Sequence, residues 1–448
     1  MKTRREFLVM AAGAGVALKL WAPVFASGTS GSLSISTSIA VTQVFGDGIR
    51  LTDIAVQYSQ PVDGRKLNLA DFTVEGRTVT DVFTSRSANP ADRGTAGEYV
   101  IIALSPKDKN AVLAEKLTAK KTDKTHKPTQ GGPGNAGDVP TYDTVYPTAK
   151  ASFEQVGSLY GVSGSTLSPE KTLRMTHSVN NLIVDDFRQF EFHDPKTGRS
   201  LKYNLFIPAG YSKERAWPMV IFMHDAGATS DVTRTTLYQG LGAICWASPE
   251  DQAQRPCFVL APQYEEIIAD DKSHTSAMLD TTVNLIQHLA EQYHLDRSRL
   301  YTTGQSGGCM MSIAMDIKYP DLFAASFLVA GQWDPLLVKP LARQKLWIIV
   351  SQDDDKAWPG QNAIVDVLEH EGANVTRAEW DGTWDARQFR QAFGLVEEKN
   401  SPINYITFRK GTVVPDGESM AGASGHRNTW RIAYTIEPVR EWIFRQHK

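Results

Sequence analysis

Gly304-Gln305-Ser306-Gly307-Gly308 places a serine between glycines in the pattern GxSxG. The string alone is weak, but a strand-like run at 299–303 leads into it and a helix-like run at 309–315 leads out. A strand, a tight turn and a helix in this order expose a serine hydroxyl at a strained corner, where glycines remove side chains that would clash. The start of the helix would direct backbone N–H groups toward developing negative charge. The pattern therefore predicts Ser306 as a nucleophile.

A nucleophilic serine needs a base to take its proton, and the base needs a carboxylate to hold its tautomer. With this kind of turn the chain order is serine, acid, histidine, and three histidines follow Ser306. His370 lies in a helix-like stretch, and His447 is next to last in the chain. His426 lies in a loop rich in glycine and serine, after the last expected strand at 405–408 and before a closing helix. We therefore expect His426 to be the base.

The acid should lie in a loop after a strand near the end of the sheet. Three adjacent carboxylates, Asp353, Asp354 and Asp355, follow the expected strand 346–350. We expect Asp354 to be the acid, by register with an HGxxD pattern that is degenerate here. Asp355 is the near alternative. Asp334, which follows the preceding strand, is a more distant one, expected instead to shape the pocket.

An oxyanion hole needs a second backbone donor from the loop after an early strand. The expected strand 219–223 is followed by an HGxG-type loop in which Asp225 replaces the first glycine. We expect the N–H groups of Ala226 and Gly307 to bind the oxyanion. His224 belongs to this loop motif, so a structural hydrogen-bonding role is expected for it.

Tryptophans gather in or beside the loops at the expected mouth of the site. Trp333 and Trp384 are candidates for a flat apolar wall that binds substrate, although these rings could equally pack the loops down. No HExxH, Walker motif or His/Cys cluster occurs, so we expect no metal and no cofactor. Three cysteines cannot form a disulfide scaffold. Cys245 and Cys257 could pair after export, but Cys257 opens an expected buried strand.

From residue 187 onward, strand-like runs alternate with helix-like runs. The expected strands are 201–207, 219–223, 258–261, 300–303, 325–330, 346–350 and 374–380. Several are continuous apolar runs, which is typical of a parallel sheet covered by helices on both faces. Residues 179–448 are therefore expected to form an α/β domain.

Residues 32–178 have a different pattern. Between 32 and 104, apolar and polar residues alternate in short segments separated by Gly, Asp and Pro, which indicates a β-sandwich. A lysine-rich stretch at 107–127 and a glycine-rich stretch at 131–137 read as a solvated loop. Since no His, Asp and Ser grouping there suggests chemistry, we expect an accessory domain.

The N-terminus predicts export. Thr3-Arg4-Arg5-Glu6-Phe7-Leu8 is a twin-arginine pattern, followed by an apolar stretch too short to span a bilayer well. Cleavage after Ala26 would remove a signal peptide of residues 1–26 and place the protein in the periplasm or outside the cell. This removes four of the 47 basic and one of the 50 acidic residues, and leaves a charge of −6. This net negative charge argues against a nucleic-acid partner. No segment after residue 26 predicts membrane insertion.

Residues 179–448 resemble bacterial secreted esterases of the α/β-hydrolase superfamily. The group resembled carries an N-terminal immunoglobulin-like domain and is related to feruloyl-esterase and polyhydroxybutyrate-depolymerase-like enzymes. The matching stretches are 184–187 through 203–208, 301–308 and 350–360. The resemblance implies Ser306, Asp354 and His426 as a catalytic triad. The chain departs from the family at Asp225 and at Asp353, where glycine is common.

These observations favour a serine hydrolase that cleaves small or polymer-derived carboxylic esters through an acyl-enzyme. A serine peptidase on the same triad is the first alternative, because the family resemblance does not settle which bond is cut. A non-catalytic binding or adhesion protein, with the sandwich as its active part, is the second. The sandwich could also serve oligomerisation of the chain or shade the mouth of the site.

Overall fold

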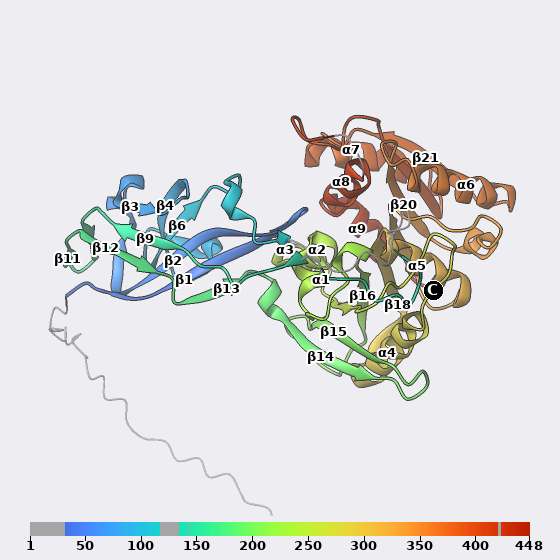
Figure 1. Cartoon of the computed structure of the whole chain (residues 1–448), viewed down its shortest axis with the longest axis horizontal. Coiled ribbons are helices and arrows are strands. Elements are labelled where there is room, and N and C mark those ends of the chain that lie inside the picture. The colour runs from blue at the N-terminus through green and yellow to red at the C-terminus, as the bar shows by residue number, and fades with distance from the viewer. Residues whose placement is uncertain (1–31, 117–133, 143, 420–422) are drawn as a thin grey trace, which may run out of the picture.

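The computed structural model describes residues 32–116, 134–142, 144–419 and 423–448. The signal peptide expected at 1–26 and most of the lysine-rich loop lie outside these residues. Two domains stand side by side, a β-sandwich and a larger domain built on one sheet (Figure 1).

The N-terminal domain is the expected immunoglobulin-like sandwich. Its larger sheet has the strand order β13 (Ser178–Asn181), β1 (Ile35–Phe45), β2 (Gly48–Asp63), β6 (Ala96–Leu104), β4 (Val79–Ser85) and β5 (Arg93–Gly94). The smaller sheet has the order β12 (Glu170–Met175), β9 (Ser152–Gln155) and β3 (Phe72–Val74). Inward-facing residues of both sheets, among them Ile54, Ile102 and Phe153, form one fully buried core. Alternation of apolar and polar residues along the strands produces this core.

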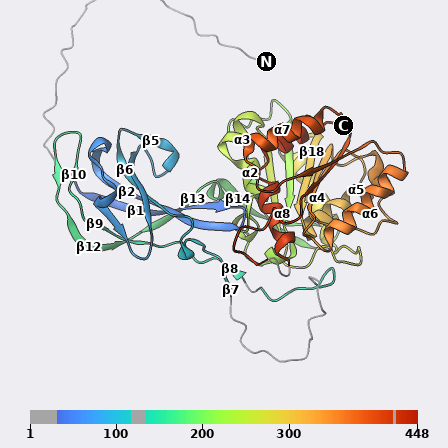
Figure 2. The ribbon, with the colours of Figure 1, turned by 90° about the horizontal axis from the view of Figure 1, so that it is seen from above.

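The long β1–β2 hairpin reaches from the sandwich to the second domain (Figures 1 and 2). Near its tip, Val44 and Ile49 are buried in the same apolar cluster as Val184 and Phe187, where the second domain begins. The two domains therefore share a packed core at their junction.

The second domain contains a nine-stranded, mostly parallel sheet. Its strand order is β14 (Phe187–His193), β15 (Ser200–Phe206), β17 (Phe258–Gln263), β16 (Trp217–Met223), β18 (Leu295–Gln305), β19 (Ala325–Val329), β20 (Leu346–Ser351), β22 (Ile403–Phe408) and β21 (Val375–Trp380). Only the pairings of β15 with β14 and β17 are antiparallel. The apolar pattern of the sequence does not predict β14, because most of its residues are exposed at the sheet edge.

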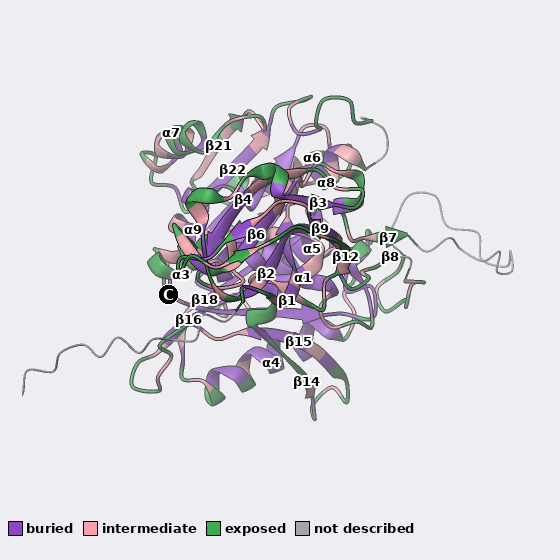
Figure 3. Ribbon diagram, turned by 90° about the vertical axis from the view of Figure 1, so that its left-hand side faces the viewer, coloured by how far each residue is buried: buried purple, intermediate pink, exposed green. Residues whose placement is uncertain are grey.

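Helices cover both faces of this sheet, as the apolar runs predict. One face is covered by α4 (Met278–Gln292), α5 (Gly307–Lys318) and α6 (Ala357–His370). The other is covered by α2 (Leu241–Ala247), α7 (Ala386–Glu397), α8 (Ser424–Ala433) and α9 (Glu437–Phe444). Alternate residues of β16 divide between the two cores: Met219 and Ile221 face the first, Val220 and Phe222 the second. Figure 3 views the molecule from the side of the sandwich, whose buried strands, among them β2 and β6, lie at its centre. Among the described residues no helix is long and apolar enough to cross a bilayer.

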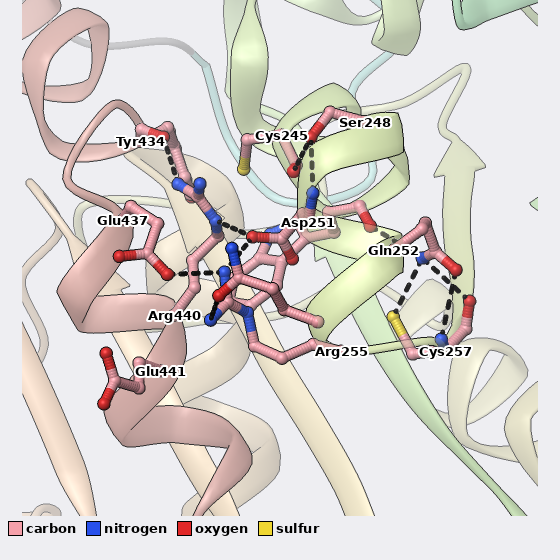
Figure 4. A network of polar contacts seen from close by, with 12 residues as sticks. Cys245, Ser248, Asp251, Gln252, Arg255, Cys257, Tyr434, Glu437, Arg440 and Glu441 are labelled. Carbon is pink, nitrogen blue, oxygen red and sulfur yellow. Dashed lines mark hydrogen bonds and ion pairs between the residues drawn. The ribbon is translucent and has the colours of Figure 1, made fainter.

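A buried ion network joins α9 to the short helix α3 (Pro249–Gln254) (Figure 4). Asp251, with 1% of its surface exposed, accepts hydrogen bonds from Arg255 at 2.6 Å and Arg440 at 2.7 Å. Arg255 also pairs with Glu437 of α9. Both arginines are nearly buried, so the pairing of Asp251 with each of them offsets charge that water scarcely reaches. Nearby Cys245 is a free thiol, as is Cys257, so the two do not pair here.

We expect Asp251→Asn to lower the free energy of unfolding by about 3–5 kcal/mol, because it leaves two buried guanidinium groups facing a neutral amide. Chemical denaturation followed by circular dichroism measures this. Asp366→Asn is the matched control: Asp366 pairs with Arg377 on the surface, so its loss should cost less than about 1 kcal/mol. Equal losses for the two variants would contradict the analysis.

A second buried carboxylate lies in α5. Burial raises the pKa of Asp316 to about 7, although a hydrogen bond with Ser326 opposes the shift. One of its carboxylate oxygens has no partner among the described residues. Since the folded state binds this proton more tightly than the unfolded chain does, the stability it contributes is complete below about pH 4. That stability is lost as the pH rises toward 7.

Asp316→Asn should therefore stabilise the protein relative to wild type, and by more at pH 8 than at pH 4, because it removes the cost of an ionised buried carboxylate. Melting temperatures of both proteins, measured across this range, test the expectation. A difference in melting temperature that does not change with pH would rule it out.

Candidate active site

The serine lies at a sharp corner between β18 and α5. Its φ of 51° is in the left-handed region that non-glycine residues rarely adopt. A Cβ atom on Gly304 would lie 2.4 Å from the backbone of Gly308, and one on Gly308 would lie 1.9 Å from the carbonyl oxygen of Met223. Only glycine fits at both positions, so the strand, turn and helix that the sequence predicts are present and expose Ser306.

His426 faces this serine. Its Nε2 lies 2.9 Å from Oγ of Ser306, and its Nδ1 is hydrogen bonded to Oδ2 of Asp354. The ring stands edge-on against Trp430, one helical turn later, at 5.0 Å between centroids. His426 lies in the first turn of α8, which begins at Ser424. The sequence predicts a loop at His426 and a later start of the helix, because the Gly/Ser-rich residues there are poor helix formers.

Asp354 is held by the start of α6. Only 3% of it is exposed, and its Oδ1 accepts the backbone N–H of Ala357 at 2.8 Å and that of Lys356 at 3.2 Å. Burial alone would raise the pKa of this carboxyl. The hydrogen bond and charge of His426 and the two N–H groups outweigh burial and hold the pKa below its usual range. The carboxylate is therefore ionised when it faces the imidazole.

The two other candidate acids do not reach the imidazole. Asp355 is exposed on the wall of the neighbouring cavity. The carboxylate of Asp334 accepts the N–H of Leu336 within its own loop. The geometry thus brings Asp354, and neither alternative, to His426.

The two expected oxyanion donors are neighbours. Ala226 opens a 3₁₀ turn (Ala226–Ala228) directly after β16, and Gly307 opens α5. A Cβ atom built on Gly307 would lie 3.6 Å from the amide nitrogen of Ala226. The N–H of Ser306 instead donates to the carbonyl of Val329. First-turn amides of a helix have no intrahelical acceptor, so this corner offers backbone donors beside Ser306.

His224 supports the same loop from behind. It is 1% exposed, and its Nε2 accepts the N–H of Tyr264 at 3.0 Å, so Nδ1 carries the proton and donates to the carbonyl of Asp225 at 2.7 Å. Burial lowers its pKa. Its ring nitrogens are occupied by backbone groups, which is the structural role expected from the sequence.

A cavity of about 960 Å³ opens over Ser306 and His426. Apolar side chains in its lining include Met310 and Trp430. The structure does not bring Trp333 or Trp384 into this lining. Trp333 is 7% exposed within the core under α5, and Trp384 packs against Phe389 at 5.8 Å. Both rings therefore pack the loops and do not line the cavity. Packing is the alternative to substrate binding that the sequence leaves open.

The sandwich contributes to the same cavity. The residues that it supplies are Gly46, Asp47, Lys116, Thr144 and Tyr146. No sequence signal marks these residues, because only the docking of the two domains places them here. In the described part of the chain, no group of three or more His, Cys, Asp or Glu residues could hold a metal ion.

Two family models match the chain. Residues 37–168 match the esterase Ig-like N-terminal domain, and residues 201–333 match the esterase PHB depolymerase family. Acetylxylan esterase A of Emericella nidulans is 42% identical over 52 residues, which cover 12% of this chain and 17% of that protein. Feruloyl esterase B of Talaromyces stipitatus is 25% identical over 140 residues, which cover 30% of this chain and 36% of that protein. The chain thus spans well under half the length of these relatives.

Among solved structures, a thermostable esterase matches with a TM-score of 0.75 and 23% identity, covering 92% of this chain and all of that one. This likeness shows a shared fold across both domains. The N-terminal domain thus matches the esterase Ig-like N-terminal domain, and the second domain has an α/β-hydrolase fold and matches the PHB depolymerase esterases.

Proposed function

We propose that the chain is a serine hydrolase of carboxylic esters, with Ser306, His426 and Asp354 as its catalytic triad. The observation that carries the proposal is the continuous hydrogen-bonded path from Oγ of Ser306 through the imidazole to a buried carboxylate. The esterase family matches of both domains support it.

In the proposed reaction, Oγ of Ser306 bonds to the ester carbonyl carbon while Nε2 of His426 takes its proton. The carbonyl oxygen becomes an oxyanion, which the N–H groups of Gly307 and Ala226 stabilise. The C–O bond to the alcohol then breaks, and His426 returns the proton to the leaving oxygen. Water attacks the acyl-enzyme by the same route, with His426 again as base, and frees the carboxylic acid and Ser306.

Asp354 stabilises the imidazolium that forms at each step. Its negative charge lies within hydrogen-bond contact of Nδ1 and is shielded from water. An ionised partner in this position favours the proton on Nδ1 and leaves Nε2 free to accept from serine.

We infer that the substrate is an ester with a bulky, polar portion. Charged and hydrogen-bonding side chains from both domains, among them Asp47, Tyr146 and Arg427, line the large cavity. A wall of this kind suits a polar group better than a long aliphatic chain. The names of the matched acetylxylan and feruloyl esterases support the same class.

We also propose that the protein works outside the cytoplasm. The twin-arginine pattern around Arg4 and Arg5 and the short apolar stretch after it support export, with the mature chain beginning after Ala26.

Ser306→Ala should lower kcat for p-nitrophenyl esters by at least about 10³-fold, and Asp354→Asn by about 10³–10⁴-fold, because each breaks the proton path. Labelling by a fluorophosphonate probe should be lost in Ser306→Ala. Asp334→Asn is the matched control and should stay within a few-fold of wild type.

Full ester turnover by Ser306→Ala would overturn the esterase assignment. Faster turnover of a matched anilide than of the ester would favour a peptidase on the same triad. Absence of both turnover and labelling in wild type would favour a binding protein.

Replacing both Arg4 and Arg5 with lysine should trap the precursor in the cytoplasm, because the positive charge is kept while the arginine pair is lost. Fractionation of a bacterial host that has a twin-arginine pathway, followed by immunoblotting, measures this. Unchanged export of the double variant would contradict the proposal.

A further inference from the structure

Asp225 occupies the position where the related loop motif has glycine, and its side chain is fully engaged. Oδ1 accepts the backbone N–H of Gly227 at 2.8 Å, which caps the 3₁₀ turn that begins at Ala226. Oδ2 accepts from Nε2 of Gln305 at 2.9 Å. One carboxylate therefore contacts both the oxyanion loop and the residue just before the nucleophile.

Gln305 is completely buried, and the acceptor-only carboxylate of Asp225 sets the orientation of its amide. Nε2 donates to Asp225 and also to Oε1 of Gln239 at 3.0 Å. If the amide were reversed, Oε1 would face the carboxylate, an acceptor against an acceptor. In the present orientation, Oε1 of Gln305 has no partner among the described residues. The bond to Asp225 is thus kept although it leaves a buried polar atom unsatisfied, which is costly.

We propose that Asp225 is a positioning residue that locks the two oxyanion donors in register. This inference rests on the proposed esterase function. One oxygen fixes the segment that carries the N–H of Ala226, and the other fixes the segment that carries Ser306 and the N–H of Gly307. The contact crosses from the end of β16 to the end of β18, so it acts on the distance between the two donors.

The negative charge of Asp225 disfavours the oxyanion, so its charge and its positioning role predict opposite effects of a substitution. Asp225 lines the same cavity as Ser306, and a carboxylate there repels the negative charge that develops on the oxyanion. If Asp225 acted through its charge alone, a neutral residue in its place would speed the reaction. If Asp225 acts by positioning, Asp225→Ala slows it, because alanine leaves the N–H of Gly227 and Nε2 of Gln305 without their shared acceptor.

Exchanging the carboxylate and the amide between positions 225 and 305 should restore the hydrogen bond that joins them. Gln305→Glu alone places two carboxylates against each other. In the double variant Asp225→Asn/Gln305→Glu, the amide donates and the carboxylate accepts, so the bridge returns with its roles reversed. Gln239 can reverse its own amide to follow, because its Nε2 has no partner among the described residues.

The experiment measures kcat and KM for p-nitrophenyl acetate and the inhibition constant of phenylboronic acid, which forms a tetrahedral adduct with a nucleophilic serine. Asp225→Ala and Gln305→Glu should each lower kcat at least tenfold with KM within threefold, and should each raise the inhibition constant by a similar factor. In the double variant, kcat and the inhibition constant should both return to within about fivefold of the wild-type values. Asp231→Asn removes an exposed charge in the following loop and is the control for charge. It should change neither kcat nor the inhibition constant.

An Asp225→Ala protein with kcat equal to or above that of wild type would overturn the positioning role. A double variant Asp225→Asn/Gln305→Glu that is no faster than Gln305→Glu alone would do so as well. If wild type still labels with fluorophosphonate in these cases, the esterase proposal stands and only the role of Asp225 fails. Wild type that neither labels nor hydrolyses the ester would overturn both.

Discussion

The hydrogen-bonded path from Ser306 to Asp354 depends on the carboxyl ends of neighbouring parallel strands meeting at one edge of the sheet. Ser306 follows β18, Asp354 follows β20, and His426 comes from the chain after β22. The loop with Ala226 follows β16, and β16 pairs with β18 on the side opposite β19. Parallel pairing thus brings together segments up to 200 residues apart in the sequence.

The backbone around Ser306 allows these segments to come into contact. Ser306 is held in a strained conformation between glycines that allow β18, α5 and the end of β16 to approach within contact. Such strain is tolerated only where the surrounding structure fixes the residue, and here buried strands on both sides do so. Rigid strands carry the reacting groups, while the wall of the cavity comes from loops and from a second domain. This division allows the site to keep its chemistry while its substrate preference changes.

Much of the fold and of the site geometry could be predicted from the sequence. The order of strand, GxSxG and helix is a local signal that predicts the corner at Ser306. Chain order then leaves three candidate bases, and the position after the last expected strand favours His426 among them. The choice among three adjacent aspartates depended on register with a degenerate pattern, and only the coordinates show that the carboxylate of Asp354 turns inward. The edge strand β14 was missed because exposed residues carry little apolar signal.

The tryptophans and the second domain show where sequence reasoning fails. Trp333 and Trp384 lie in loops near the site, but Trp333 is buried in the core and the half-buried Trp384 packs against Phe389, since side-chain direction in a loop depends on tertiary packing. Tyr146 and the tip of the β1–β2 hairpin lie on the cavity wall because two domains dock. The link between Asp225 and Gln305 joins residues 80 positions apart, and neither residue type by itself indicates it.

The central claim is that Ser306 becomes acylated during turnover. Rapid mixing with p-nitrophenyl acetate, acid quenching within one turnover and peptide mass spectrometry test it most directly. The account predicts a mass gain of one acetyl group on the peptide that contains Ser306. An acetyl group on a different residue, or ester hydrolysis with no acylated intermediate under conditions where deacylation is slow, would contradict it.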